Sequence, residues 1–335
     1  MDLQKLDKIL EKAPGFRKAQ VQRFVFNNLI EDWDEASSLP KELRETLKAN
    51  VSLKIEHERF QSKENNATKE LITLDDGYRI ETVMMRHEDG RNTVCVSSQI
   101  GCALGCVFCA TGKMGFIRNL TADEIVMQVL LFNRLLKKDK KQVTNVVFMG
   151  MGEPMLNYDN VIKSIYFMND KNTFGLGARK FSISTVGVVD GIRKLAEEKM
   201  EINLAVSIHA PNDMLRTRLM PINRKWNLLQ LFKAIDNYIE KTNRRVMLEY
   251  TLIKGVNDFV EAAEQLTALV KNKLCFVNLV TYNRTRFYSP PLASAVKKFS
   301  DYLEKNHVPF TLRQTFGHDI AAACGQLAST KKIKE

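Results

Sequence analysis

The sequence has no long hydrophobic run. No stretch of its 335 residues approaches the roughly 20 consecutive apolar residues that are needed to span a bilayer. The opening stretch, MDLQKLDKILEKAPGF, alternates charged side chains with Leu and Ile at helical spacing, which is unlike a secretory signal. Repeats and low-complexity segments are missing as well. These absences lead us to expect a cytoplasmic protein that has no membrane partner.

Cysteine is infrequent in this chain. The six cysteines are Cys95, Cys102, Cys106, Cys109, Cys275 and Cys324. A reducing cytoplasm disfavours a structural disulfide framework, so the close grouping of three of these residues indicates metal binding or catalysis. No motif surrounds Cys275, which we interpret as a structural residue.

Acidic residues are outnumbered by basic ones. The chain has 50 Lys and Arg against 39 Asp and Glu, which gives a net charge of +11 and a pI of about 9.3. Such a surplus favours a polyanionic partner, because each phosphate that a protein neutralises releases counterions. A soluble protein that is simply basic is the alternative. Basic residues cluster at 137–141 and in a tail at 329–335.

The first part of the chain differs in pattern from the rest. Residues 1–60 have apolar residues at helical spacing and predict a helical accessory domain. Two β-like stretches, 68–74 and 78–85, flank a turn at Asp75-Asp76-Gly77 and predict a hairpin within an extension at 61–92. The main domain is then expected at 93–328, followed by the basic tail.

From residue 93, short β-rich runs alternate with segments of helical length. The six runs are 94–98, 143–149, 180–185, 202–207, 246–252 and 276–280. A capping box of Thr121 and Glu124 opens the helix predicted at 121–136. Six strands that alternate with helices indicate an α/β fold with a parallel sheet. A seventh run, 310–313, is expected to precede a short C-terminal helix.

The strongest chemical signal is the segment Cys102-Ala-Leu-Gly-Cys106-Val-Phe-Cys109. Three thiolates within eight residues can surround one metal centre, and the glycines at 101 and 105 permit the tight turns that this requires. Three ligands would leave one iron of a four-iron cluster open to a small molecule. A zinc site is the alternative, but it would need a fourth Cys or His, and none lies within the loop.

The C-x3-C-x2-C spacing, with an aromatic residue before the last cysteine, resembles the radical S-adenosylmethionine superfamily. The resemblance implies a partial (β/α)6 barrel and one [4Fe–4S] cluster held by Cys102, Cys106 and Cys109. In that superfamily, S-adenosylmethionine chelates the open iron, and its reductive cleavage gives a 5′-deoxyadenosyl radical. A low-potential donor such as flavodoxin or ferredoxin would supply the electron.

Further candidate contacts lie where successive predicted strands end, which is the usual functional face of an α/β barrel. Each alone is more often structural, but they share one predicted rim. Gly152 would let the backbone approach S-adenosylmethionine, and Glu153 could accept hydrogen bonds from its amino group. The residues expected to hold the ribose and adenine, or to close the strands beside them, are Ser184, Ser207, Ile208, His209 and Asn283.

From about residue 81 to 327 the sequence closely resembles the RlmN/Cfr family of radical RNA-adenosine methyltransferases. The motifs are VSSQ before the cysteines, GCALGCVFCATGKMGF, GMGEP, SIHAPND, MPIN, GVND and AACGQL. The resemblance implies methylation of carbon 2 of an adenosine in the peptidyl-transferase centre of 23S rRNA and of an adenosine in tRNA beside the anticodon. We expect a monomer that consumes two S-adenosylmethionine molecules per turnover.

The resemblance also implies roles for three residues outside the cluster. Cys324 would first be methylated, and the radical would then abstract hydrogen from that methyl group, so that the resulting carbon radical adds to adenine. Cys95 would resolve this covalent adduct by forming a disulfide with Cys324. Glu81 would act as a proton acceptor near the base. The alternative for Cys95 and Cys324 is a structural role as small buried residues. The alternative for Glu81 is an exposed residue of a strand.

The position of the methyl group stays open between two branches of the family. The cysteine motif, Pro154 and the segment 209–213 are similar to the carbon-2 branch, whereas Ser182-Ile-Ser-Thr185 also resembles the carbon-8 branch that confers antibiotic resistance. Phe316-Gly317 replaces the usual Arg-Gly, and Arg284 stands where Pro is usual. A radical enzyme that does not methylate, and a zinc-containing RNA-binding protein, are the other classes considered.

Overall fold

The computed structural model describes residues 3–11, 13–283 and 288–328. The predicted basic tail at 329–335 and Arg284 lie outside these described residues. Within the described part of the chain, no helix is long and apolar enough to cross a membrane.

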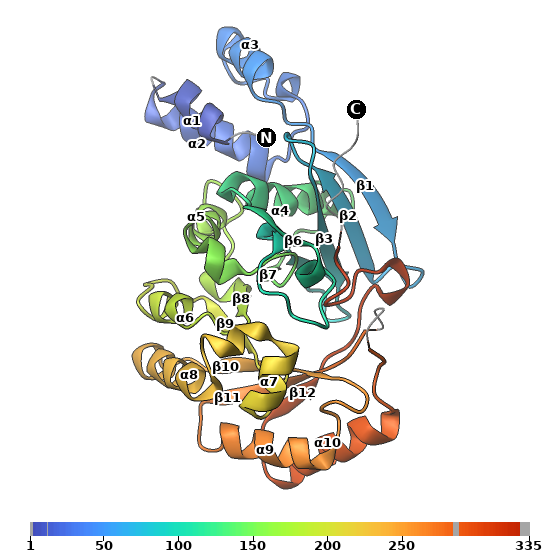
Figure 1. The fold of residues 1–335 in the computed structure, drawn as a ribbon. Helices are drawn as coiled ribbons and strands as arrows, with labels where there is room; N and C mark the ends of the chain where they lie inside the picture. The colour runs from blue at the N-terminus through green and yellow to red at the C-terminus, as the bar shows by residue number, and fades with distance from the viewer. Residues whose placement is uncertain (1–2, 12, 284–287, 329–335) are drawn as a thin grey trace.

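A small helical unit opens the chain and packs against the main body (Figure 1). Its helices are α1 (Leu3–Leu10), α2 (Gly15–Gln22) and α3 (Lys41–Asn50), with a π-helical turn at Arg23–Asn27 and a 3-10 turn at Trp33–Glu35. Hydrogen bonds fix it to helices of the main body: the Arg134 guanidinium donates to the carbonyl of Leu53 over 2.7 Å, and the Leu3 N–H donates to Asp123 over 2.8 Å.

The prediction of helix up to residue 60 is wrong at its end. Residues Glu56–Gln61 form strand β1, which pairs antiparallel with β2 at the edge of the sheet. All six side chains of β1 are exposed, so its sequence, EHERFQ, carries no apolar alternation that could indicate a strand. The pairing with β2, rather than the local pattern, defines this element.

Among the described residues, ten strands form one sheet in the order β1-β2-β3-β4-β7-β8-β9-β10-β11-β12. Strands β1 to β4 are antiparallel, and β4 through β12 are parallel, so the predicted hairpin, β2 and β3, continues directly into the barrel. The bounds are β1 Glu56–Gln61, β2 Ala67–Thr73, β3 Arg79–Arg86, β4 Asn92–Cys95, β7 Asn145–Phe148, β8 Phe181–Thr185, β9 Asn203–Ser207, β10 Val246–Leu252, β11 Cys275–Thr281 and β12 Phe310–Leu312.

Helices follow the parallel strands and lie along the outer side of the curved sheet (Figure 1). The predicted capping box is confirmed, because the Thr121 hydroxyl accepts the Glu124 N–H while the Glu124 carboxylate accepts the Thr121 N–H. The helices are α4 Ala122–Lys137, α5 Tyr158–Asn169, α6 Val189–Ala196, α7 Asp213–Leu219, α8 Leu228–Thr242, α9 Val260–Val270 and α10 Ala293–Lys305.

The expected C-terminal helix is not found in the described residues after β12. That part of the chain has a 3-10 turn at His318–Ile320 instead. Gly317, Ala321 and Gly325 have positive φ values of 63°, 50° and 81°, and these left-handed residues interrupt any helix. The segment instead runs back over the barrel. Its Gly325 carbonyl accepts the Ala110 N–H over 2.9 Å, which brings it against the cysteine loop.

Candidate active site

A small hairpin that the sequence analysis did not predict carries the cysteine loop. Strands β5 (Gln99–Cys102) and β6 (Gly115–Asn119) pair antiparallel, with Cys102 opposite Gly115. Gly101 has φ +73°, and a Cβ built on it would lie 1.9 Å from the Gly115 carbonyl oxygen. Only glycine fits this approach of the two strands beside the first cysteine.

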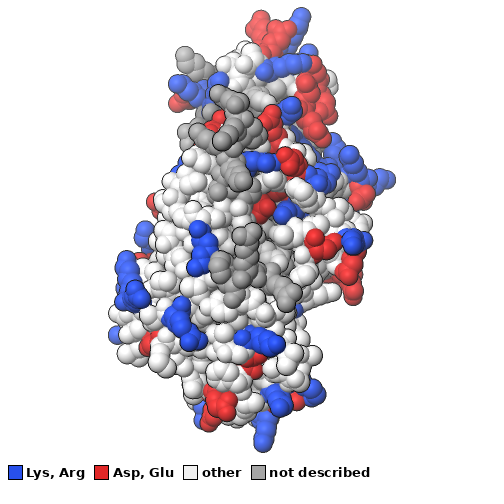
Figure 2. Space-filling view, turned by 45° about the vertical axis from the view of Figure 1, so that its right-hand side comes forward, with Lys and Arg blue, Asp and Glu red and all other residues white. Residues whose placement is uncertain are grey.

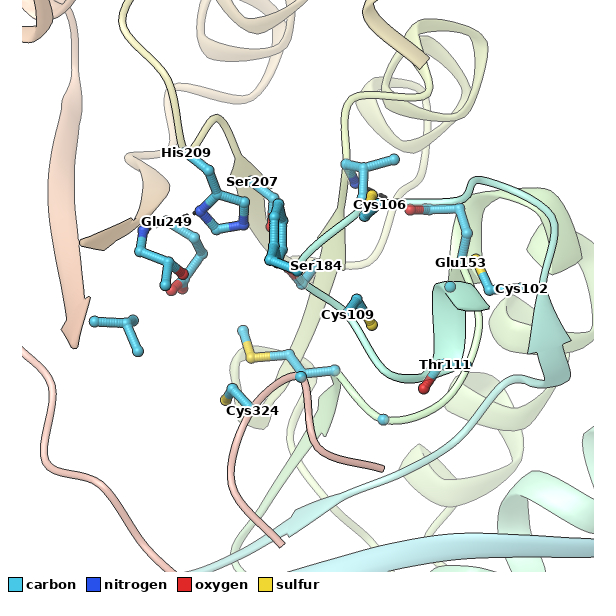
Figure 3. Close-up of a pocket in the computed structure, with 18 of the residues that line it drawn as sticks. Cys102, Cys106, Cys109, Thr111, Glu153, Ser184, Ser207, His209, Glu249 and Cys324 are labelled. Atoms are coloured by element: carbon cyan, nitrogen blue, oxygen red, sulfur yellow. Dashed lines mark hydrogen bonds between the residues drawn. The ribbon is translucent and has the colours of Figure 1, made fainter. Parts of the chain in front are cut away.

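The three thiols of the loop line one cavity, which we call the central cavity (Figure 3). Burial raises the pKa of the Cys102 thiol to about 11 and raises the pKa of the Cys106 thiol well above its usual range, and the neighbouring thiolates add to both shifts. Deprotonation of thiols as buried as Cys102 and Cys106 needs a cationic centre to stabilise the charge. The donor set therefore fits an iron–sulfur cluster.

The zinc alternative would require ligands gathered around one ion. In the ranges that the structure describes, no three His, Cys, Asp or Glu side chains, the loop cysteines included, are placed to hold a single metal ion. His87, the nearest histidine before the loop in sequence, instead hydrogen-bonds Thr93 and stacks edge-on against Phe316.

The hairpin gives a first prediction. In Gly101→Ala, the methyl group meets the Gly115 carbonyl, so we expect β5 and β6 to separate at a cost of ~3 kcal/mol or more. Iron bound per chain after anaerobic reconstitution should fall by about half or more, since the first ligand moves. Gly90→Ala is the matched control, because Gly90 also has a positive φ, +84°, but its Cβ would meet nothing within 4 Å. Equal iron in both variants would contradict the assignment.

The other wall of the central cavity comes from the ends of the parallel strands. The cavity has a volume of about 170 Å3, far more than the roughly 15 Å3 that holds one water. Of the residues predicted to contact S-adenosylmethionine, those that line it are Gly152, Glu153, Ser184, Ser207, His209 and Asn283. Side chains from three neighbouring strands and the cysteine loop thus face one space (Figure 3).

Glu153 joins two of these strand ends. One carboxylate oxygen accepts the Met155 N–H over 3.0 Å, and the other accepts the Val186 N–H over 2.9 Å. Burial raises the pKa of Glu153 to about 7, although both hydrogen bonds oppose the rise. Gly152 lies at φ +97°, and a Cβ there would come within 2.5 Å of Gln99. The turn is therefore held rigidly beside Cys102.

His209 is a neutral donor in this wall. Its Nδ1 accepts the Thr251 N–H over 3.0 Å, so the proton of the neutral ring lies on Nε2. Burial, aided by the charge of Arg216, lowers the pKa of His209 to about 3. The ring also packs edge-on against Phe108, with 5.0 Å between centroids. The side chain is fixed on both sides, and it keeps one hydrogen-bond donor throughout the physiological pH range.

Cys324 and Cys95 are both free thiols, and they meet at a second cavity that adjoins the first. Cys324 is exposed and lines both cavities, whereas Cys95 is 8% exposed and lines only the second, which we call the side cavity. Asn283 donates to the Cys324 carbonyl over 3.3 Å. Burial raises the pKa of Cys95 to about 12, and the negative charge of a Cys324 thiolate contributes to this rise.

Two predicted site residues face neither cavity. Ile208 is fully buried in the core. Glu81 is 7% exposed; its carboxylate pairs with Lys69 over 3.1 Å and accepts the Ala328 N–H over 2.9 Å. Glu81 therefore fastens the C-terminal segment to the β-extension, next to the segment that carries Cys324. The structure does not bring its carboxylate into the pocket.

Sequence reasoning missed several polar residues of the cavities. Thr111, Glu249 and Arg313 all line the central cavity, and Thr111 donates to the Leu327 carbonyl over 2.6 Å. Glu249 stands alone as a charge in the apolar strand VMLEYTL, and Arg313 follows the apolar strand end FTL. For Glu249, a lone charge within a buried strand was the available signal.

Comparison with known proteins agrees with this architecture. Residues 96–266 match the profile of the Radical SAM superfamily. The solved "Crystal Structure of a radical SAM methyltransferase from Sphaerobacter thermophilus" has a TM-score of 0.93 and 40% sequence identity, covering 98% of this chain and 97% of that one. The fold and the cysteine-lined cavity thus define a radical S-adenosylmethionine enzyme.

Curated relatives narrow the class. A Geobacillus kaustophilus protein named "Probable dual-specificity RNA methyltransferase RlmN" is 42% identical over 323 residues, which is 96% of this chain and 88% of the relative. A Carboxydothermus hydrogenoformans protein of the same name is 43% identical over 93% of this chain and 92% of its own length. The chain belongs to the RlmN/Cfr family. The predicted fold and the methyltransferase class are confirmed, and the superfamily implies a [4Fe–4S] cluster and S-adenosylmethionine.

Proposed function

We propose that this enzyme methylates carbon 2 of an adenosine in the peptidyl-transferase centre of 23S rRNA, and of an adenosine beside the tRNA anticodon. The relatives' printed name, with its dual specificity for RNA, supports this substrate class. One observation carries the chemistry: two free thiols outside the cysteine loop, Cys95 and Cys324, share the side cavity, and Cys324 also lines the central cavity. Simple methyl transfer from a sulfonium would need neither thiol.

The two thiols act in sequence in this proposal. The Cys324 sulfur takes the methyl group of one S-adenosylmethionine and becomes a thioether that faces the central cavity. A cluster held by Cys102, Cys106 and Cys109 would supply the electron that cleaves a second S-adenosylmethionine to a 5′-deoxyadenosyl radical. The 5′-deoxyadenosyl radical would abstract a hydrogen atom from the Cys324 methyl group, and the methylene radical would add to carbon 2 of adenine. The adduct would then lose the carbon-2 proton and one electron, which the oxidised cluster would accept. Cys95 attacks the Cys324 sulfur, the sulfur–methylene bond breaks, and the methylated base is released with uptake of a proton as a disulfide forms.

The wall residues hold the second substrate in place. Ser184, Ser207, His209 and Asn283 supply hydrogen-bonding groups for the ribose and adenine, and His209 does so through its Nε2–H. Glu153 keeps the β7 and β8 turns together and leaves carboxylate lone pairs free for an amino group. Ile208 would contribute only through its backbone, since its side chain is in the core. For Glu81, a proton-acceptor role would require the C-terminal segment to shift from its carboxylate.

RNA binding is assigned to the basic surface and the accessory domain at 1–60. Lys and Arg are spread over the face drawn in Figure 2, with Asp and Glu interspersed among them. The extension at 61–92 and the main domain at 93–328 would hold the target adenosine of the RNA at the cavities. A flavodoxin or ferredoxin is the proposed electron donor, and the enzyme is proposed to act as a monomer.

The test is mass spectrometry of ribosomal and transfer RNA from cells with and without the gene. We expect 2-methyladenosine to disappear from both RNAs on deletion, and to return when the gene or its Cys275→Ala variant is restored. Cys275 contributes to neither cavity, which makes this variant a control for expression. Loss of 8-methyladenosine instead would support the carbon-8 branch, which the segment Ser182–Thr185 favours. Unchanged RNA would refute both assignments.

A further inference from the structure

Arg313 is the charged residue that connects the two cavities. It follows β12 directly, its backbone N–H donates to the Leu279 carbonyl over 2.8 Å, and its side chain lines both the central and the side cavity. Cys324 lines both cavities as well, and Cys95 lines the side cavity. Arg313 therefore lines the side cavity together with both thiols.

Among the described residues, the contacts that Arg313 makes leave much of its donor capacity for the cavities. Its Nη1 lies 3.6 Å from the Met149 sulfur and 3.9 Å from a Glu249 oxygen. Both Glu249 oxygens are already held by the Asn278 amide, over 3.0 and 3.1 Å. Arginine has five N–H donors, and a close two-point pair with a carboxylate is its usual arrangement when it is withdrawn from water. Here the carboxylate is held at a longer distance.

The charges around Arg313 point to the thiols. The pKa of Arg313 lies above its usual value, first because of a Cys324 thiolate and further because of Glu249 and Cys95, against the opposing effect of burial. The same guanidinium lowers the pKa of Cys95, which burial and the Cys324 charge raise. The other titratable groups that line the two cavities are Cys102, Cys106, Cys109, Glu153, His209 and Tyr282, and His87 also senses the charge of Arg313.

We propose that Arg313 is a positioning residue that serves the two thiols in turn, first stabilising the Cys324 thiolate and then, once methylation has removed that charge, the Cys95 thiolate. This inference rests on the proposed function. Methylation of Cys324 forms a sulfur–carbon bond, breaks the carbon–sulfonium bond and releases S-adenosylhomocysteine, so it turns an anion into a neutral thioether. The like charge that opposes ionisation of Cys95 is then gone, while the guanidinium remains.

The second step needs that ionisation. The Cys95 sulfur bonds to the Cys324 sulfur, and the bond from Cys324 to the methylene carbon breaks with its electron pair on the carbon, which takes up a proton. The two sulfurs are thereby oxidised to a disulfide, and the carbon is reduced to a methyl group. Only the thiolate of Cys95 is an effective nucleophile for this attack. One cation thus supports both steps because the first step frees it for the second.

The test measures thiol reactivity without RNA or S-adenosylmethionine, so its outcome does not depend on the proposed substrate. Holoenzyme, whose cluster occupies the loop cysteines, is treated with iodoacetamide from pH 6 to 10, and alkylation of the Cys324 peptide is followed by mass spectrometry. For Arg313→Gln we expect the pH at which the alkylation rate of Cys324 is half-maximal to move up by about one unit. Alkylation at neutral pH should then slow about threefold, because the rarer thiolate is also more nucleophilic. Arg313→Lys should restore most of the rate.

A substitution at Glu249 is expected to have the opposite effect on the alkylation of Cys324. Glu249→Gln removes the anion that partly neutralises Arg313, so the midpoint for Cys324 should move down rather than up. A merely structural role for the Glu249–Arg313 pair would predict the same direction for both variants. Arg313→Gln with Glu249→Gln removes both charges, which avoids a buried unpaired carboxylate, and should still alkylate more slowly than wild type. Arg179→Gln, an exposed pair partner of Glu201, is the charge-matched control.

The Cys95 half of the inference is tested on enzyme purified with Cys324 already methylated. Alkylation of Cys95 should also slow about threefold in Arg313→Gln. Unchanged profiles for both thiols in an Arg313→Gln holoenzyme with full iron content would overturn the inference while leaving the proposed function untouched. Normal thiol profiles with no RNA methylation at all would instead refute the function.

Discussion

Replacing Cys95 with Ala is expected to trap a covalent complex between the enzyme and its RNA. Cys324 stays available to the central cavity, so the steps that join its methyl carbon to adenine proceed. The thioether then has no thiolate to attack its sulfur, because the other two thiols that line the side cavity are Cys95, which is removed, and Cys109, which is assigned to the cluster. Methylated RNA should fall by about a thousandfold or more, as when other nucleophiles are removed.

The complex is detected by denaturing electrophoresis of enzyme purified from cells, before and after ribonuclease treatment. Mass spectrometry of the digested band should find the nucleotide attached at Cys324, with roughly one RNA per chain. Cys275→Ala is the matched control: Cys275 is also buried and free, but it lies at the start of β11 and lines neither cavity. If the Cys95→Ala enzyme carries no crosslinked RNA, the two-thiol mechanism fails.

Much of the barrel could be predicted from the chain alone. Most of its parallel strands are largely buried, so they occur as short apolar runs. The six predicted runs overlap strands β4, β7, β8, β9, β10 and β11, the first of them by only two residues. Edge elements were harder to find. β1 is exposed along its whole length, and the β5–β6 hairpin depends on Gly101 fitting under the Gly115 carbonyl, which is a tertiary contact.

The candidate site also has one part that could be predicted from nearby residues in the sequence and another part that only the fold brings together. Cys102, Cys106 and Cys109 are close in sequence, so their common cavity could be inferred from spacing. Cys95 and Cys324 are far apart, and only the family resemblance linked them. The position of Cys324 depends on the C-terminal segment, whose own backbone atoms bond to the Glu81 carboxylate, the Ala110 N–H and the Thr111 hydroxyl and carry no sequence signature.

Glu81 illustrates what local reasoning cannot weigh. Its carboxylate was predicted to face the base, yet it is paired with Lys69 and accepts the N–H of Ala328. The side chain of a strand residue points to one of the two faces of the sheet. Which of these faces a later segment of the chain covers depends on the whole fold. Arg313 shows the converse. Its sequence context, FTLRQ, marks the end of a strand, and only the structure brings it beside both thiols.

Replacing Cys324 with Ala is expected to abolish methylation of RNA while radical formation continues. The cluster cysteines and the wall of the central cavity are untouched, so cleavage of S-adenosylmethionine to 5′-deoxyadenosine should persist at up to about the wild-type rate. No methyl group can be stored on the protein, so methylated RNA should fall by about a thousandfold or more. Radiolabelled methyl from S-adenosylmethionine should appear on wild-type protein and be missing from the variant.

The pair of readouts separates the classes of enzyme that share this fold. A radical enzyme that does not use a methyl relay predicts normal product formation in Cys324→Ala and no label on the wild-type chain. A general folding defect predicts that 5′-deoxyadenosine and iron content fall together with methylation, and Cys275→Ala controls for the loss of a thiol as such. Only a thiol that carries the methyl group predicts uncoupling, because Cys324 lines the radical-generating cavity without belonging to the cysteine loop.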